Sequence, residues 1–186
     1  MHNQHVKIKQ QGFTLVEAII TVGITTVLLA IAAPHLTVMI KNNRLSSYIN
    51  EFAATLYLAK SEAIKRSSPV RVCPSADGAS CATSGTWEQG WIVFDDKDND
   101  QTVDTNEDIV YVHETLPNNL VLKGTQFTQG VTYLPNGRIV PSLNGSIVLC
   151  DNRVANDYAK KLVLIRTGRF RIETASSTNH ITCPVS

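Results

Sequence analysis

Residues 12–34 read GFTLVEAIITVGITTVLLAIAAP, and this stretch decides how the rest of the chain is interpreted. The 23 residues from Ala18 to Ile40 contain no Asp, Glu, Lys or Arg. An α-helix of about 20 apolar residues is long enough to span the hydrocarbon core of a bilayer. The sequence therefore predicts a membrane-spanning helix over residues 13–40.

The short polar segment before this stretch predicts its orientation. Lys7 and Lys9 are its only full charges, and positive residues favour the cytoplasmic side of a membrane. We therefore expect a single-pass inner-membrane protein whose globular part lies in the periplasm. A cleaved secretory signal, for which Ala30-Ile31-Ala32 offers a small-residue site, and a plain signal anchor are alternatives. Glu17 argues against the plain anchor, because a carboxylate within an apolar segment is costly and marks a functional partner.

The segment GFTLVE over residues 12–17 resembles the class III leader junction of type IV pilins and type II secretion pseudopilins. The resemblance implies a leader over residues 1–12, which prepilin peptidase removes by cleavage after Gly12, with N-methylation of Phe13. It also implies that Glu17 helps subunits dock during filament assembly. Other pilin subunits are then expected partners, because a neighbouring subunit's terminal ammonium can compensate a carboxylate buried in lipid.

Beyond the apolar stretch, apolar residues recur in alternating steps of four and three, which is the pattern of one helix face. They are Leu45, Ile49, Phe52, Leu56, Ala59 and Ala63. Pro69 disfavours helix at the residue before it, so we expect an amphipathic helix over residues 41–67. Residues 69–186 consist of short β-type runs separated by turn sequences such as Pro135-Asn136-Gly137 and Thr167-Gly168.

The predicted fold class is therefore α+β: a long N-terminal α-helix, with a membrane half and an amphipathic half, packed on antiparallel β-sheets. The globular domain is expected over residues 41–186. The expected strands are Val70–Cys73, Gly90–Phe94, Ile109–His113, Leu120–Leu122, Val131–Leu134, Arg138–Val140, Ser146–Cys150, Leu162–Arg166 and Arg169–Ile172.

Three segments resemble the globular part of the GspH/FimT group of minor pilins and pseudopilins. They are LAKSEAIKR over 58–66, Val72-Cys73, and WEQGWIVFD over 87–95. The resemblance runs from Gly12 to about Arg171, which is nearly the whole chain. It implies the type IV pilin-like fold, in which an N-terminal helix packs on β-sheets.

The four cysteines fit either two disulfides or one metal site. Disulfides are the default in an oxidising periplasm, and the C-x2-C and H-x3-H spacings typical of zinc sites do not occur. Of the three pairings, we expect Cys73 with Cys81, which closes a short loop. We expect Cys150 with Cys183, which would tie the polar tail after Thr174 to the sheet.

An acidic segment has the spacing of a calcium-binding loop. Five carboxylates fall at positions 1, 3, 5, 9 and 12 of an EF-hand-like loop: Asp96, Asp98, Asp100, Asp104 and Glu107. Gln101, however, occupies position 6, where the tight turn normally needs glycine, and the flanking segments read as strands. A solvated hairpin loop without a cofactor is therefore the main interpretation, with calcium as the alternative.

The formal net charge of +1 arises by cancellation. Side-chain charges sum to +3 over residues 1–50, −6 over 51–123 and +4 over 124–186. This balance argues against a histone-like polycation or an acidic tail protein, and it places the excess of basic residues in the last third of the chain.

The last third contains a predicted hairpin with its turn at Thr167-Gly168. Arg169 and Arg171 then share one strand face, and Phe170 and Ile172 share the other. Forked guanidinium donors match phosphate oxygens, so this face is a candidate phosphate-binding surface. Arginines that only protect a soluble sheet edge are the alternative.

The sequence GRFR over residues 168–171 resembles the GRxR motif of DNA-binding FimT-type minor pilins. The resemblance implies DNA contact by Arg169 and Arg171, with Gly168 shaping the turn. Basic residues nearby in the sequence join this candidate set: Arg166, Lys160 and Lys161. The sequence leaves open whether Arg138 and Arg153 lie on the same surface.

The expected function follows from these two resemblances. We expect a minor type IV pilin that binds double-stranded DNA non-specifically and supports DNA uptake in natural transformation. The alternative is a structural minor pseudopilin of type II secretion, or an assembly-priming minor pilin without DNA binding. Either would be incorporated into a pilus or pseudopilus at the cell surface. An enzyme is not expected, because G-x-S-x-G, H-E-x-x-H and P-loop motifs are absent from the sequence.

Overall fold

The computed structural model describes residues 12–83, 86–151, 153, 158–174 and 183. The chain divides into two compact units, Met1–Lys41 and Asn42–Ser186. A single α-helix, α1 (Leu15–Arg66), begins in the first unit and ends in the second. Its helical backbone continues through Pro34. The predicted leader, with Lys7 and Lys9, lies outside the described residues except for Gly12.

The part of α1 in the first unit combines an apolar surface with internally bonded hydroxyl groups. Thr14 Oγ1 accepts the backbone N–H of Glu17 at 3.2 Å, so Thr14 caps the helix N-terminus. The hydroxyls of Thr21, Thr25 and Thr26 donate to carbonyls one turn earlier at 2.7–2.9 Å. Hydroxyls bonded in this way add little polarity to the helix surface. By length and composition, α1 is able to cross a membrane.

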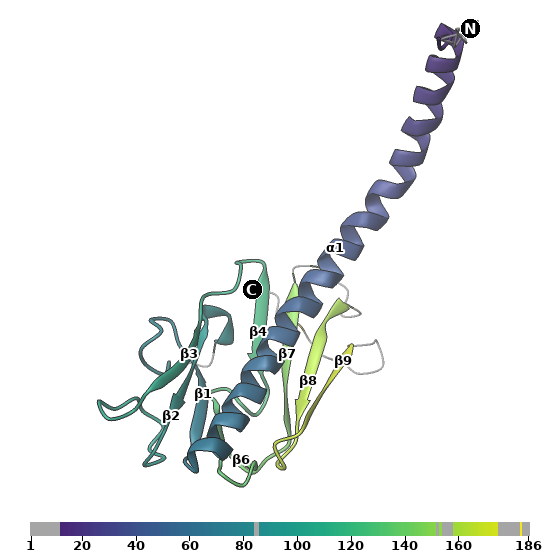
Figure 1. Ribbon diagram of the computed structural model, residues 1–186. Coiled ribbons are helices and arrows are strands. Elements are labelled where there is room, and N and C mark those ends of the chain that lie inside the picture. The colour runs from purple at the N-terminus through teal and green to yellow at the C-terminus, as the bar shows by residue number, and fades with distance from the viewer. Residues whose placement is uncertain (1–11, 84–85, 152, 154–157, 175–182, 184–186) are drawn as a thin grey trace, which may run out of the picture. The chain divides into compact units, whose positions relative to one another are not determined.

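The second unit contains two antiparallel sheets, which flank the C-terminal half of α1 (Figure 1). One sheet has the strand order β3-β2-β1-β5-β6 and the other β4-β7-β8-β9. A 3-10 helix, η1 (Trp87–Gln89), precedes β2. The strands are β1 (Val70–Pro74), β2 (Trp91–Asp95), β3 (Ile109–His113), β4 (Leu120–Gly124), β5 (Val131–Tyr133), β6 (Ile139–Val140), β7 (Gly145–Asp151), β8 (Lys160–Leu164) and β9 (Phe170–Thr174).

The core lies between α1 and both sheets. The predicted stripe on α1 is confirmed, since its six apolar side chains are each at most 1% exposed. At its centre, Phe52 makes edge-to-face contacts with Trp87 and Trp91 at centroid distances of 5.2 and 5.1 Å. The indole N–H of Trp91 donates to Thr55 Oγ1 at 3.1 Å, so the polar edge of this buried ring is satisfied.

The α+β fold class is confirmed, and each of the nine expected strands has a counterpart in the structure. The strand boundaries differ from the prediction by one or two residues, except in β3, and two of these differences affect the basic motif. The strand expected over Leu162–Arg166 is β8, which starts two residues earlier and ends at Leu164. Arg169 precedes β9, because the connecting loop uses the backbone from Ile165 to Arg169 for its own hydrogen bonds.

Candidate nucleic-acid interface

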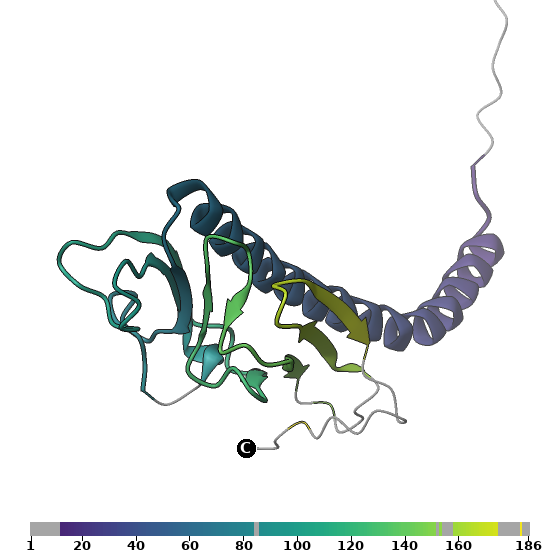
Figure 2. The same ribbon diagram turned by 90° about the horizontal axis from the view of Figure 1, so that it is seen from below.

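The β8–β9 hairpin carries the predicted basic motif (Figures 1 and 2). Val163 pairs with Arg171 and Leu164 pairs with Phe170 across the two strands. In the loop, the N–H of Gly168 donates to the carbonyl of Ile165 at 2.8 Å, and the N–H of Ile165 donates to the carbonyl of Arg169 at 3.0 Å. This is the pattern of a three-residue hairpin loop that ends in a left-handed residue.

Gly168 is the left-handed residue of that loop, with φ +72°. A Cβ at this position would lie 2.1 Å from the carbonyl oxygen of Gly137, so the position has no room for a side chain. Gly137 ends the equivalent loop between β5 and β6, where Gly137 N–H donates to the Leu134 carbonyl at 2.8 Å. Lys60 of α1 donates from Nζ to the Gly168 carbonyl at 3.3 Å. Two loops, one from each sheet, are therefore packed together beside α1.

Alternation along the chain places Arg171 of β9, and Arg169 immediately before β9, on the side that points away from α1. Phe170 points toward the helix, and its ring centroid lies 4.4 Å from that of Tyr57. Arg169 and Arg171 are both exposed, and the Arg171 side chain is 69% exposed. The two guanidinium groups are thus available to solvent, as the strand pattern predicts.

A shallow hollow of about 200 Å³ lies beside these arginines. It is lined by Val163, Ile165, Arg169, Phe170 and Arg171. Aliphatic side chains from β8 and the loop therefore lie next to the guanidinium groups. Glu173 accepts a hydrogen bond from Arg171 Nε, so one carboxylate neutralises part of this basic surface.

The structure separates the two predicted lysines. Lys161 pairs with Glu173 on the face of Arg171. Lys160 pairs with Thr174 on the opposite face, and its Nζ donates to Thr174 Oγ1 at 3.1 Å. Lys160 is therefore removed from the basic face, because neighbouring strand residues point to opposite sides. Arg166 is exposed at the tip of the loop.

The structure also settles the positions of Arg138 and Arg153. Ile139 N–H donates to the Arg166 carbonyl at 3.3 Å, which brings exposed Arg138 beside the β8–β9 loop. The turn sequences Asn136-Gly137 and Thr167-Gly168 predict the two hairpins, but the packing of one loop on the other depends on long-range contacts.

Arg153 has a structural role instead. It donates to Asp151 Oδ2 at 2.7 Å and to Asn42 Oδ1 at 2.8 Å, and its guanidinium lies 4.1 Å from the Tyr158 ring centroid. These contacts join the end of β7 to α1, so Arg153 does not belong to the basic face.

The acidic loop connects β2 to β3, as its sequence predicts. Carboxylate oxygens of Asp96, Asp98 and Glu107 lie within 4.8 Å of one another, and Asp98 forms a second such group with Asp100 and Asp104. Asp96 is fully buried. Burial raises the pKa of Asp96, and the nearby negative charge of Glu107 adds to this effect.

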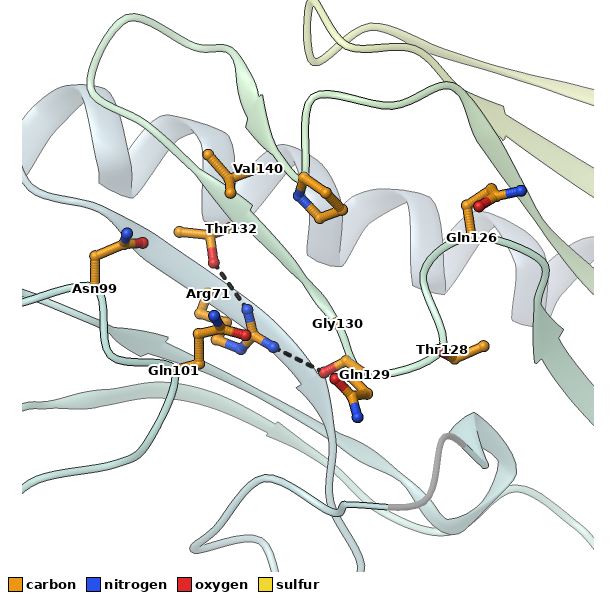
Figure 3. A pocket seen from close by; sticks show the side chains of 10 residues that line it. Arg71, Asn99, Gln101, Gln126, Thr128, Gln129, Gly130, Thr132 and Val140 are labelled. Atoms are coloured by element: carbon orange, nitrogen blue, oxygen red, sulfur yellow. Dashed lines mark hydrogen bonds between the residues drawn. The ribbon is translucent and has the colours of Figure 1, made fainter.

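A polar pocket of about 220 Å³ lies beside the acidic loop, with buried Arg71 at its base (Figure 3). Arg71 donates to Thr132 Oγ1 at 3.1 Å and to the carbonyl of Gln129 at 3.0 Å. Burial lowers the pKa of this guanidinium. Asn99 and Gln101 of the acidic loop line the same pocket. A buried arginine could not be predicted from the sequence, because Arg71 stands between two valines in a short strand.

Two disulfides have the expected pairing. Cys73 is bonded to Cys81, and Cys150 is bonded to Cys183. The second crosses from β7 to a residue beyond the tail segment 175–182, which lies outside the described residues.

The role of His113 could not be predicted from the sequence. Its ring stacks on the Trp91 ring at a centroid distance of 3.7 Å, and its Nε2 lies 3.2 Å from Glu51 Oε1. His113 thus contributes to packing of β3 against α1.

Comparison with known families gives two matches. The family described as type II transport protein GspH matches residues 48–168, which is more than half of the chain. The chain belongs to the GspH family. The prokaryotic N-terminal methylation motif matches residues 7–33 of the same chain. No curated protein sequence matches this GspH-family chain.

Solved structures show what the fold is similar to. The type IV minor pilin FimU of Pseudomonas aeruginosa, in two crystal forms, is 20% identical, with TM-scores of 0.55 and 0.57. These matches cover 71% and 73% of this chain and 97% and 94% of the FimU chains. The minor pseudopilin EpsH of Vibrio cholerae is 14% identical and covers 69% of this chain and 95% of its own, with a TM-score of 0.48. The similarity to FimU shows that the GspH-family chain has the type IV pilin-like fold.

The family match and the basic motif occupy adjoining parts of the sequence. The GspH match ends at Gly168, so Arg169 and Arg171 follow directly after it. The family assignment therefore does not depend on the two arginines. The methylation motif includes Gly12, Phe13 and Glu17. The chain therefore combines membership of the GspH family with the fold of minor type IV pilins and pseudopilins.

Proposed function

We propose that this GspH-family chain is a minor type IV pilin that binds double-stranded DNA non-specifically through Arg169 and Arg171 and supports DNA uptake in natural transformation. The observation that carries the proposal is the exposed arginine pair on the outer face of β9. The hairpin loop that precedes the pair is held in place by Gly168, which packs against the second loop. Two guanidinium groups on such a support can bind neighbouring phosphates.

The chemistry of this surface favours contact with the DNA backbone. Guanidinium groups bind phosphate oxygens without regard to the base sequence, and each phosphate contact releases condensed counterions. Lys161 and the loop residues Arg138 and Arg166 extend the positive charge around the hollow. With few contacts per subunit, binding is expected to be weak, and several subunits on one filament would strengthen it by multivalency.

Maturation belongs to the same proposal. Prepilin peptidase removes the leader after Gly12 and N-methylates Phe13. The apolar part of α1 is anchored in the inner membrane, with the globular unit in the periplasm, until the subunit joins a filament. Glu17 then contacts a neighbouring pilin subunit. Mass spectrometry of the exported chain should give the mass that begins at N-methyl-Phe13, and a chain that begins at Ala33 would contradict this maturation.

The DNA-binding surface is tested by charge removal. Arg169→Gln and Arg171→Gln should each weaken retardation of double-stranded DNA, and the double variant should abolish it at concentrations where the wild type binds. Lys65→Gln is the matched control, because Lys65 is an exposed cation on α1 that pairs with Glu62. Unchanged retardation by the double variant would reject the site.

A structural role in type II secretion is the second candidate, since the matched family is described as a type II transport protein. The two functions are separated by deletion of the gene, scored in parallel for DNA uptake and for exoprotein secretion. Loss of transformation with normal secretion supports the DNA-binding pilin. Loss of secretion with normal transformation supports the pseudopilin.

A further inference from the structure

The acidic loop between β2 and β3 brings together carboxylates from its two ends. Asp96 and Asp98 come from the start of the loop and Glu107 from its end, yet their carboxylate oxygens lie within 4.8 Å of one another. Both Glu107 oxygens accept backbone N–H groups, from Lys97 at 2.7 Å and from Asp104 at 3.1 Å. Glu107 is therefore held in place facing the start of the loop.

Asp96 supplies an independent observation. Its side chain is fully buried, and its Oδ1 accepts the N–H of Gln101 at 3.3 Å. Its Oδ2 is also buried and has no hydrogen-bond partner among the residues that the structure describes. A buried carboxylate oxygen without a donor carries a large desolvation cost unless a cation compensates it. Asp96 is thus the buried member of the carboxylate group, and in the described part of the chain no cation donates a hydrogen bond to its Oδ2.

Two cations face this region, and both are held by other groups. Arg71 attracts Asp96 electrostatically, but it donates to Thr132 and Gln129. Lys97 donates to the carbonyl of Asn106 and lies 3.8 Å from Asp95 Oδ2. Among the described residues, no lysine, arginine or histidine forms an ion pair with Asp96.

The loop backbone is compatible with an EF-hand-like path despite its missing glycine. Gln101 stands at the position where glycine is expected, and it adopts the left-handed conformation with φ +76°. Val103 stands at position 8 of the loop, counted from Asp96, where an aliphatic residue is expected. It packs against the buried cluster of Cys73, Ile92 and Phe94. The presence of Gln101 in place of glycine therefore does not prevent the turn that a calcium loop requires.

We infer that Asp96, Asp98 and Glu107 form a binding site for a divalent cation, and that calcium is the ion that fits it. Hard cations prefer oxygen ligands, and calcium accepts an irregular set of carboxylates and waters more readily than magnesium does. The site lies in the loop between β2 and β3, whereas the basic motif lies in the β8–β9 hairpin, so this inference does not depend on the proposed DNA binding.

Calorimetric titration of the full chain in neutral detergent, at constant ionic strength, tests the site with calcium chloride alone. We expect a dissociation constant of about 0.1–1 mM, the range of extracellular calcium modules. Asp98→Asn should weaken binding at least about tenfold, because it removes the exposed ligand charge and keeps the side-chain shape. Asp108→Asn is the matched control, since Asp108 is the residue after Glu107, is exposed and pairs with Arg66 instead.

Thermal unfolding of the wild type provides a second readout that needs no variant. Calcium at about 10 mM should raise the Tm by about 3–10 °C, because a ligand that binds only the folded state stabilises it. Magnesium at the same concentration should raise it less. Equal Tm shifts with both ions would indicate charge screening and would overturn the site. A calorimetric titration without heat of calcium binding would also overturn it, as would equal calcium affinities of Asp98→Asn and Asp108→Asn.

Discussion

At the scale of single residues, the position of the basic motif depends on the glycine that precedes its arginines. Gly168 combines a left-handed backbone with a contact that leaves no space for a Cβ. The resemblance to the GRxR motif predicted that Gly168 shapes a turn. It did not predict the contact with Gly137, because that residue lies 31 positions earlier in the sequence and belongs to the other sheet.

Gly168→Ala should therefore destabilise the globular unit. The left-handed backbone alone costs about 1–3 kcal/mol for a residue with a side chain, and displacement of the Gly137 carbonyl adds to this. We expect a Tm that is lower by at least about 3 °C for a chain of this size. Thr167→Ala, in the same loop, serves as the control and should change the Tm by about 1 °C or less. Equal stability of Gly168→Ala and the wild type would contradict the contact.

Removal of the Glu173 carboxylate tests the basic face by an expected gain in DNA affinity. This carboxylate accepts from Arg171 and lies across from Lys161, so it competes with phosphate for the basic face. Glu173→Gln should strengthen DNA binding by up to about fivefold, because exposed ion pairs contribute about 0.2–1 kcal/mol. Fluorescence anisotropy with labelled duplex DNA measures the affinity. Glu114→Gln, which removes an exposed carboxylate elsewhere on the protein, is the control. Weaker binding by Glu173→Gln would show that the carboxylate organises the site instead of competing for it.

At the scale of helices and strands, periodicity predicted most of what the structure contains. The stripe from Leu45 to Ala63 on α1 and the two faces of β9 follow from residue spacing alone. Loop packing did not follow, since Arg138 reaches the basic hairpin through a contact between sheets. Strand alternation separates Lys160 from Lys161, so their closeness in the sequence does not place both on the basic face.

The disulfide-closed loop after β1 gives a prediction about pH. The N–H of Ala79, together with the hydroxyl and N–H of Ser80, holds the pKa of Asp77 well below its ordinary value. A carboxyl whose folded pKa is depressed stabilises the fold above its unfolded pKa of about 3.9, and this contribution is lost as the pH falls below that value.

Asp77→Asn should therefore lower the Tm at pH 7, and the difference from the wild type should narrow between about pH 5 and pH 2. The amide can still accept hydrogen bonds, so the variant tests the charge and not the loop conformation. Thermal unfolding across this pH range, with the disulfides kept oxidised, provides the measurement. A constant difference at all pH values would show that the charge of Asp77 does not contribute.

At the scale of the whole molecule, a near-neutral chain distributes its charge unevenly. The β2–β3 loop concentrates carboxylates, whereas the loops and outer face around β9 concentrate exposed arginines. A net charge of +1 predicts nothing about DNA by itself. Regional charge was readable from the sequence, but the grouping of basic residues from two hairpins required the fold.

The salt dependence of DNA binding should reflect how few phosphates each subunit contacts. For two to four contacts, the logarithm of the affinity should fall with the logarithm of salt concentration with a slope of about −2 to −4. The Arg169→Gln, Arg171→Gln double variant should reduce the slope by about 2. Anisotropy titrations at several potassium chloride concentrations measure both values. A slope that the double variant leaves unchanged would place the contacts elsewhere.

The packing of one hairpin loop against the other also determines how the protein opens. The Ile139 N–H that donates to the Arg166 carbonyl links strand β6 of one sheet to the loop of the other. One sheet cannot leave α1 without the other unless this link breaks. Opening of the two sheets is therefore coupled, and the Ile139 amide should exchange its hydrogen for deuterium only in the slow, cooperative fluctuation that exposes both sheets at once.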